Sequence, residues 1–352
     1  MPQINKRKLL LLLAILLIAS VVVFVLARQP KDKDAPQQAN ASLFAMNTYM
    51  NFMANGENAE AAVDEAMQLV SDCEKRWSVT DRGSEISALN AKGHAVLSDD
   101  TAALLRLATK YSAFTNGCFD CTVYPLVRAW GFTNGNYRVP GSNEIAALLT
   151  HVGNNNLSLS ENSASLSTGS MVDLGGIAKG HVGDLVMQFF KSKNISSALI
   201  SLGGNIQTLG LKSDGSKWRI GIQSPYDKND LLGSVSVGEC CVITSGAYER
   251  YFIAEDGTRY GHIISPFTGY PATNGLASAT VVCNRGSLGD ALSTALFVMG
   301  TDEAIRFWQT HEGFDVLLLS DDGTLYVSEG IFSSFSPSKS NVVKKVCEIK
   351  RS

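Results

Sequence analysis

The sequence of 352 residues predicts a fold of the α+β class. Segments with the 3.6-residue period of helices and short runs rich in β-branched residues both occur, but they do not alternate along the chain as a doubly wound sheet requires. Hydrophobic residues make up 45% of the sequence and charged residues 18%, a composition that supplies a core and excludes a disordered chain. The main part of the chain can bury one large core or two lobes, so we expect a single two-lobed domain.

Four segments carry the helical pattern. In the first, Val63, Val70 and Trp77 recur on one face, and Gly117 ends the second. The predicted helices are Asn58–Trp77, Thr101–Asn116, Gly180–Phe190 and Gly289–Met299. Strands are predicted where β-branched and other apolar residues concentrate. These runs are Ala198–Leu202, Trp218–Ile222, Cys241–Thr244 and Ala279–Cys283.

One long apolar run lies near the N-terminus. Residues Leu9–Ala27 carry no charge, Lys6–Lys8 precede them, and Arg28 follows. About 20 apolar helical residues span a bilayer, and a positive flank stays in the cytoplasm. We therefore expect residues 1–28 to be a signal anchor, or a signal peptide removed after Ala27, with the bulk of the chain outside the cell membrane. A buried core helix is the alternative interpretation.

Two polar segments flank the main domain. Residues 29–42 are rich in Lys, Asp, Gln, Asn and Ala, which is typical of a flexible stalk. Residues 337–352 contain several Lys and Arg residues, and we expect them to form a solvated basic tail. The domain itself then comprises residues 43–336.

The charge balance excludes two classes of protein. Lys and Arg total 30 and Asp and Glu total 33, so the formal net charge is −3. A nucleic-acid-binding protein would usually show a basic excess or a long basic block. A polytopic membrane protein would show several long apolar runs, whereas this chain has one.

The seven cysteines do not form a disulfide framework, because their number is odd and their positions are scattered. Cys118 and Cys121 form a CxxC motif, which suits a redox pair or half of a zinc site, but no second CxxC completes a zinc site. A thioredoxin-like CxxC opens a helix, whereas this motif follows a helix that Gly117 ends. Cys240 and Cys241 lie in an apolar strand, where packing is the simpler interpretation.

The first candidate site is the segment Asp173–Gly180, with the sequence DLGGIAKG. Its glycines precede a predicted helix and can present backbone N–H groups to an anion, and Lys179 can pair with a phosphate. The segment is neither a Walker loop nor a Rossmann fingerprint. A glycine turn needed only for close packing is the alternative.

The second candidate site lies in the last predicted helix. Asp290, Ser293 and Thr294 share one helical face, because they are three and four residues apart. Carboxylate and hydroxyl oxygens suit Mg²⁺, which keeps waters and shares substrate phosphates. An acidic residue that the helix dipole favours in the first turn is the alternative.

Three further segments place polar groups after predicted strands. His262 precedes a Ser-Pro-Phe-Thr-Gly turn and can exchange a proton near neutral pH. Thr244–Gly246 ends a strand with two hydroxyl groups, and Ser201–Asn205 ends one with two glycines. Each of the three also fits an ordinary strand-ending turn or a satisfied polar residue.

Taken together and in this order, the segments resemble the ApbE-like family of FAD:protein FMN transferases. The resemblance extends from about Phe44 to about Phe335 and is highly specific, because it combines eight separated motifs. The matching segments are Phe44–Thr48, Trp77–Val79 with Ser84–Asn90, Gly117–Val123 with Pro125–Val127 and Trp130–Phe132, Asp173–Gly180, Gly203–Asn205, Thr244–Gly246, His262–Gly269 and Asp290–Thr294.

The resemblance implies an enzyme that uses Mg²⁺ to transfer FMN from FAD to a Thr or Ser hydroxyl of an exported acceptor protein. AMP leaves, and the flavin is then linked to the acceptor by a phosphoester. Acceptors in this family are redox-pump and electron-transfer subunits with a Ser/Thr-Gly-Ala-type flavinylation site. A membrane-held domain of this α+β type is therefore expected outside the membrane, beside its acceptors.

The resemblance also implies roles for individual residues. His262 would help to deprotonate the acceptor hydroxyl. The metal ligands would be the Gly176 carbonyl, Asp290 and Thr294, with Ser293 close by. The residues implied to line the FAD site are Met46, Trp77, Cys118, Phe119, Asp120, Asp173, Lys179 and Ile264.

Three places depart from the family pattern. Asn47 stands where Gly is usual, beside the flavin. Cys118 and Cys121 stand where small residues and Pro are usual, and Ser265 replaces an acidic or amide residue before a proline. None of these changes removes the implied metal ligands. The alternatives are a Mg²⁺-dependent FAD pyrophosphatase that yields FMN and AMP, a non-catalytic flavin-binding protein tethered to the membrane, and a CxxC redox protein.

Overall fold

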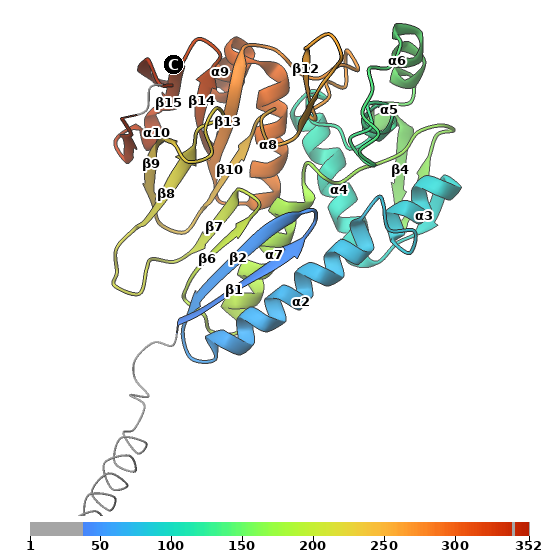
Figure 1. Ribbon diagram of the computed structural model, residues 1–352. Coiled ribbons are helices and arrows are strands. Elements are labelled where there is room, and N and C mark those ends of the chain that lie inside the picture. The colour runs from blue at the N-terminus through green and yellow to red at the C-terminus, as the bar shows by residue number, and fades with distance from the viewer. Residues whose placement is uncertain (1–37, 340–341, 352) are drawn as a thin grey trace, which may run out of the picture. The chain divides into compact units, whose positions relative to one another are not determined.

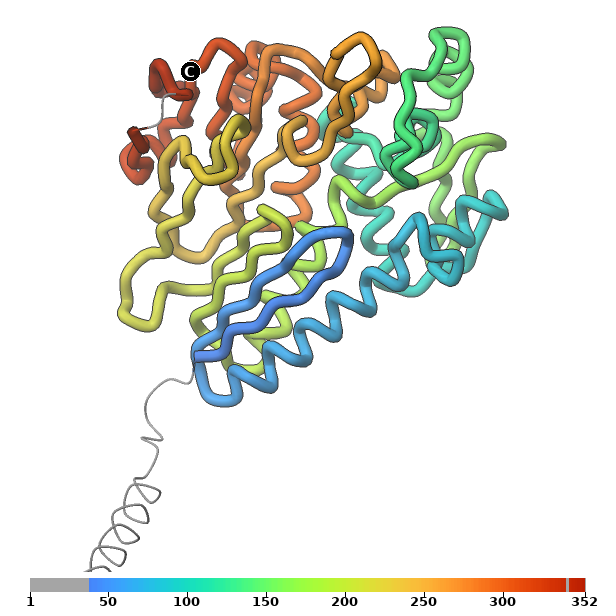
Figure 2. Tube along the Cα trace, viewed as in Figure 1, coloured from blue at the N-terminus to red at the C-terminus, as the bar shows by residue number. Residues whose placement is uncertain are grey.

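A nine-stranded sheet forms the centre of the computed structural model, which describes residues 38–339 and 342–351 (Figure 1; Figure 2). Neighbouring strands are antiparallel apart from the last two, which are parallel. In spatial order the strands are β1 (Gln38–Ala45), β2 (Thr48–Asn55), β6 (Ser197–Leu202), β7 (Asn205–Leu209), β10 (Cys241–Ser245), β13 (Leu276–Cys283), β14 (Phe314–Ser320), β15 (Thr324–Ser328) and β17 (Lys345–Ile349).

Helices and smaller sheets surround this centre. The helices are α2 (Ala59–Trp77), α3 (Glu85–Lys92), α4 (Asp99–Phe114), α5 (Tyr124–Ala129), α6 (Ser142–Leu149), α7 (Ala178–Ser192), α8 (Gly286–Met299), α9 (Thr301–Thr310), α10 (Glu329–Phe332) and the 3₁₀ turn η1 (Asn154–Asn156). The smaller sheets are β3 (His94–Val96) with β5 (Ser163–Leu166) and β4 (Leu157–Ser160), β16 (Phe335–Pro337) with β9 (Leu231–Val237) and β8 (Trp218–Gln223), and the hairpin of β11 (Tyr251–Ile253) and β12 (Arg259–Gly261).

The two faces of the central sheet have different partners. Side chains alternate between faces along a strand. Cys241 and Ile243 of β10 therefore join the apolar cluster that contains Leu292 of α8. Val242, between them, joins the cluster that contains Ile220 of β8. Helices thus cover one face and the three-stranded sheet β16-β9-β8 covers the other.

A close contact between α7 and α8 brings two of the predicted site segments together. Gly180 lies in the first turn of α7, and a methyl group there would come within 2.1 Å of the Gly286 carbonyl oxygen. Only glycine allows the two helix starts to approach this closely. The segment before α7 and the first turns of α8 therefore share one wall of the site.

The predicted helices and strands are confirmed, with ends that shift by up to three residues. The start of α4 explains one shift. Ser98 caps this helix by accepting a hydrogen bond from the Thr101 N–H, and two acidic residues occupy the first turn. The helix consequently begins at Asp99 rather than at Thr101. The predicted mixed α and β content is confirmed, and the contacts group residues 37–352 as one compact unit rather than as two.

The expected solvated tail is wrong for most of its C-terminal part. Residues Lys345–Ile349 form β17, which pairs in parallel with β15. Ile349 is buried in the core, while Lys345 stays exposed. Exposed lysines are common on edge strands, which explains why the composition resembled a tail. The expected stalk is also too long, because Gln38–Ser42 already belong to β1.

The apolar run Leu9–Ala27 lies outside the described residues. Among the residues that the structure does describe, no helix combines the length and apolar character needed to cross a bilayer.

Candidate active site

A cavity of about 940 Å³ gathers residues from nine separate parts of the chain. Its walls include the turn between β1 and β2, the end of α2, the glycine turn before α7, the end of β10 and the first turns of α8. The predicted site residues that line it are Met46, Trp77, Cys118, Phe119, Asp120, Asp173, Gly176, Lys179, His262, Ile264, Asp290 and Thr294. Ser293 does not line it.

Asp290 is held at the inner end of the cavity with one oxygen already engaged. Its side chain is only 3% exposed, and Oδ2 accepts a hydrogen bond of 2.9 Å from the Gly180 N–H. This bond fixes the orientation of the carboxylate against the start of α7. A buried carboxylate with a single partner of this kind is suited to a cation.

Hydroxyl groups lie next to this carboxylate. The Ser245 Oγ is 2.8 Å from the Ser293 Oγ and 3.4 Å from the Thr294 Oγ1. Ser293 is fully buried and also donates to the Asp290 carbonyl at 3.0 Å. Its hydroxyl is therefore engaged within the protein, and we assign it a supporting role instead of the expected place close to the metal.

The donor set fits a hard cation such as Mg²⁺. A methyl group on Gly176 would lie 3.7 Å from the Thr294 Oγ1, so the glycine turn is adjacent to the hydroxyl. Within residues 38–339 and 342–351, no group of three or more His, Cys, Asp or Glu side chains forms a metal cluster. One carboxylate, one hydroxyl and a carbonyl would leave most positions to waters or phosphate oxygens, as Mg²⁺ prefers.

The glycine turn before α7 is organised by Asp173. The Gly175 N–H donates to its Oδ1 at 2.9 Å, and the Lys179 ammonium lies 3.5 Å from the Gly175 carbonyl oxygen. Burial raises the pKa of Asp173, while the Gly175 N–H and the charges of Arg250 and Lys179 oppose this shift. The turn therefore combines a constrained backbone with a cation that faces the cavity.

Asp120 lines the cavity but has structural partners for both oxygens. Oδ1 accepts from the Thr122 N–H at 2.8 Å and the Thr122 hydroxyl at 2.6 Å, and Oδ2 accepts from Ser112 at 3.1 Å. These bonds fix the loop that carries Phe119. The Phe119 ring in turn lies against Gly176, where a methyl group would approach it to 3.2 Å.

The CxxC motif lacks the features of a redox pair. All seven cysteines, which lie in the described residues, are free thiols. Burial raises the pKa of Cys118 to about 11 and raises that of Cys121 well above its ordinary value. Catalytic cysteines need a lowered pKa, because the thiolate is the reactive form. This argues against the redox alternative.

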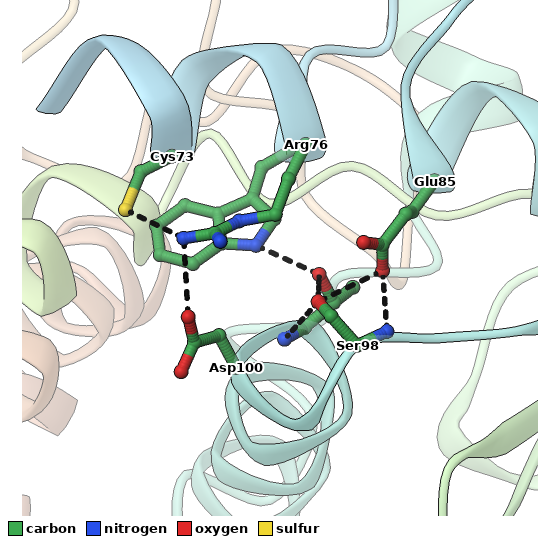
Figure 3. A network of polar contacts seen from close by, with 7 residues as sticks. Cys73, Arg76, Glu85, Ser98 and Asp100 are labelled. Atoms are coloured by element: carbon green, nitrogen blue, oxygen red, sulfur yellow. Dashed lines mark hydrogen bonds and ion pairs between the residues drawn. The ribbon is translucent and has the colours of Figure 1, made fainter. Parts of the chain in front are cut away.

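Trp77 forms a rigid part of the wall at the end of α2. It is 4% exposed, and its Nε1 donates to the Thr101 hydroxyl at 3.0 Å. Next to it, Arg76 forms an ion pair with Asp100 at 3.1 Å, which joins α2 to α4 (Figure 3). The Ser98 N–H donates to Glu85 at 2.8 Å and ties α3 to the same corner. This network explains why the indole is fixed without direct support from a ligand.

Met46 and Asn47 form the turn at the outer end of the β1–β2 hairpin. Their φ angles are 49° and 60°, so both adopt the left-handed conformation of a two-residue hairpin turn. Asn tolerates this conformation better than most residues, which explains how Asn47 can occupy a position where the resemblance implies Gly. The Met46 N–H donates to Glu74 at 2.6 Å and fixes the turn against α2.

His262 lies on the opposite wall and is half-buried. Its Nδ1 is 3.2 Å from the Arg250 carbonyl oxygen. Desolvation, together with the positive charges of Arg250 and Lys179, lowers the pKa of His262 to about 3. With Nδ1–H donating to that carbonyl, Nε2 is the nitrogen left to accept a proton.

Sequence reasoning assigned no role to Glu249, Arg250 and Asn205, which line the cavity, although Asn205 belongs to the Gly203–Asn205 motif. Glu249 and Arg250 follow the Thr244–Gly246 motif and lie on the same wall as His262. Asn205 is 2% exposed, and its Nδ2 has no hydrogen-bond partner in the described part of the chain. The only signal in the sequence was the placement of Glu249 and Arg250 shortly after a strand-ending motif. Glu249 is exposed by surface area, but desolvation beside the cavity walls raises its pKa to about 6.

Comparisons with known proteins find relatives over most of the chain. The profile of the ApbE family matches residues 46–318. A protein of Klebsiella pneumoniae named FAD:protein FMN transferase is 32% identical over 285 residues, which cover 79% of this chain and 88% of the relative. The ApbE protein of Thermotoga maritima superposes with a TM-score of 0.77 at 30% identity, over 86% of this chain and 97% of that one. The flavin transferase ApbE of Vibrio cholerae gives 0.72 at 28% identity, over 88% and 99%.

Proposed function

The chain belongs to the ApbE family, and on this basis we propose that it is an FAD:protein FMN transferase. The observation that carries the proposal is a single cavity that combines oxygen donors on α8, a glycine turn with Lys179, and His262. Transfer of a flavin phosphate needs these three elements, because a phosphoryl reaction depends on positioning and on neutralised charge.

We assign the inner end of the cavity to Mg²⁺. Asp290, Thr294 and the Gly176 carbonyl would hold the ion, and the buried Ser293 would support Ser245 beside them. When bound, Mg²⁺ supplies positive charge that neutralises a pyrophosphate. Lys179 faces the same space and adds a positive charge from the protein.

The rest of the cavity would hold FAD. Met46, Trp77, Cys118, Phe119 and Ile264 provide an apolar wall for the ring systems. Asp120 and Asp173 act through the backbone of the two loops that they organise, as their hydrogen bonds indicate. A volume of about 940 Å³ lies within the range of ligand pockets.

His262 is the proposed proton acceptor. The acceptor hydroxyl oxygen forms a bond to the FMN phosphorus, and the bond between this phosphorus and the bridging oxygen breaks, so AMP leaves with that oxygen. The hydroxyl proton passes to Nε2 of His262, which is neutral at physiological pH because its pKa is lowered to about 3. A bound pyrophosphate would oppose the charges of Arg250 and Lys179 and raise this pKa toward neutrality.

We further propose that the acceptors are exported proteins with a Ser/Thr-Gly-Ala-type site, and that the product is a phosphoester. The apolar run Leu9–Ala27 supports this placement, because it has the length and the positive flank of an export signal or anchor. Redox-pump and electron-transfer subunits are the acceptor class that this placement suits.

An acceptor assay tests the proposal. Purified protein, FAD, Mg²⁺ and an acceptor domain should produce acceptor whose mass has increased by one FMN unit. Asp290→Ala should abolish the mass increase. His262→Ala should slow it by roughly 10²–10⁴-fold, the usual contribution of a general base.

The same assay separates the alternatives. Release of FMN and AMP without a change in acceptor mass would indicate a pyrophosphatase. FAD that binds without turnover would indicate a flavin-binding protein. Full activity of Asp290→Ala would contradict the metal assignment, and Asp302→Ala, which changes an acidic residue at the start of α9 that does not line the cavity, serves as the matched control.

A further inference from the structure

Gln207 is a residue of β7, and its side chain is buried against α7 and α8 behind the proposed metal site. Its side chain is 2% exposed, and its Nε2 donates a hydrogen bond of 2.8 Å to the Gly180 carbonyl. Gly180 is in the first turn of α7. A polar side chain in this apolar layer is costly unless it is paired, so this hydrogen bond fixes where the amide lies.

Two glycines make room for this amide. A methyl group on Gly183 would lie 2.1 Å from the Gln207 Nε2, and a methyl group on Gly286 would lie 1.8 Å from it. Gly183 belongs to α7 and Gly286 begins α8. The amide therefore occupies a slot that exists only because both helices carry glycine at this level.

The backbone of Gly180 connects Gln207 to Asp290. The Gly180 carbonyl accepts from Gln207, and the Gly180 N–H donates to Asp290 Oδ2 at 2.9 Å. Gly180 packs closely against α8, because a methyl group at this position would approach the Asp290 Cβ to 2.7 Å. The glycine therefore has no room to shift toward α8. A displacement of the amide must therefore change the position of the N–H that orients the carboxylate.

Asp184 holds the same two helices at a second point. Its carboxylate accepts from the Ser287 N–H at 2.9 Å and from the Gly286 N–H. It thus caps the start of α8 from a position one turn along α7. With this cap in place, the relative position of the helix starts is set by Asp184 on one side and by Gln207 on the other.

We propose that Gln207 is a positioning residue for the metal site, which it controls through Gly180 and the orientation of Asp290. The inference rests on the proposed function, because it takes Asp290 as a metal ligand. It assigns a role in metal affinity to a residue that lies outside the FAD cavity. Partners of metal ligands typically change metal affinity by roughly 10- to 100-fold when they are replaced.

Binding of Mn²⁺ to the full-length protein, measured by electron paramagnetic resonance without turnover, tests this inference. Gln207→Met keeps a long side chain but removes the donor, and it should weaken Mn²⁺ binding by about 10-fold or more. Gly183→Ala leaves Gln207 unchanged but fills its slot, so it should weaken binding in the same direction. Both are measured at a temperature at which circular dichroism shows a folded protein.

Thr208→Val is the matched control. Thr208 is the next residue of β7, is 3% exposed, and bonds through its hydroxyl to the Gly238 carbonyl at 2.7 Å rather than to Gly180 or Asp290. It should lose stability but keep the Mn²⁺ affinity of the unmodified protein. Equal weakening in Thr208→Val would show a general loss of stability and overturn the inference.

Two outcomes separate this inference from the proposed function. Normal Mn²⁺ binding by Gln207→Met, together with lost binding by Asp290→Ala, would overturn the positioning role and leave the metal site intact. Normal binding by Asp290→Ala would overturn the metal site and the inference with it. Weak binding by Gln207→Met, no binding by Asp290→Ala and normal binding by Thr208→Val would support both.

Discussion

Glu249 and His262 line one cavity, and desolvation moves their pKa values in opposite directions. Removal of water disfavours the charged form of each group, so the carboxyl pKa rises to about 6 and the imidazole pKa falls to about 3. Lys179 opposes the first shift and reinforces the second. These values depend on residues far apart in the chain, which is why sequence patterns alone identified His262 but not its electrostatic setting.

The raised pKa of Glu249 predicts a pH-dependent effect on stability. The folded pKa, about 6, exceeds the ordinary value of 4.5, so this group stabilises the metal-free protein below pH 4.5 and loses that contribution as the pH rises through 6. Glu249→Gln should therefore gain melting temperature relative to the unmodified protein as the pH rises from about 4.5 to about 6.5. Thermal melts across this range measure the difference.

The control for this prediction is Glu255→Gln, which changes an exposed carboxylate between β11 and β12. The melting temperature of this variant should differ from that of the unmodified protein by the same amount at every pH. A constant offset for Glu249→Gln, independent of pH, would contradict the assigned shift.

At the scale of elements, pattern strength decided what could be predicted. Helices such as α2 and α8 have long apolar faces, and the sequence pattern predicted their ends to within three residues. The β1–β2 hairpin depends on a two-residue turn without the usual Asn-Gly pair, and β17 depends on a parallel partner that is distant in sequence. Neither leaves a local signal. The start of β1 was therefore predicted to belong to the stalk, and β17 was predicted to belong to the tail.

Removal of residues 345–352 tests the role of β17. The deletion removes the buried Ile349 and Arg351, whose guanidinium donates to the His311 and Phe314 carbonyls at 3.0 Å. Loss of the isoleucine alone should lower the free energy of unfolding by about 1.5–3 kcal/mol. Urea denaturation measures this loss, and the exposed Lys345→Ala should change it by less than about 0.5 kcal/mol. An unchanged urea midpoint for the truncated protein would contradict this role of β17 and support the interpretation as a solvated tail.

At the scale of the whole molecule, the order of strands in the central sheet brings together residues that no single motif contains. Strands β7 and β10 are neighbours although some thirty residues separate them, and this pairing brings Asn205 and Ser245 to the same cavity. The motif residues that line this cavity could be predicted from the resemblance. The supporting residues Gln207 and Asp184 could not, because their role exists only once α7 and α8 are packed together.

The apolar run Leu9–Ala27 carries the last prediction. Expressed in a bacterial host, the full chain should sediment with membranes, and protease added outside spheroplasts should digest its domain, because a positive flank keeps the N-terminus inside. A chain that begins at Gln38 should stay in the soluble cytosolic fraction. A full chain found in the cytosol would favour the buried-helix alternative.

Strand β1 has a geometric consequence for access to the cavity. It extends over eight residues from Gln38 to the turn at Met46, which lines the cavity, and a strand of this length spans roughly 26 Å (Figure 1). Gln38, the first residue that the structure describes, therefore lies roughly 26 Å along the hairpin from the turn that lines the cavity. A chain that begins at Gln38 therefore retains every residue that lines the cavity.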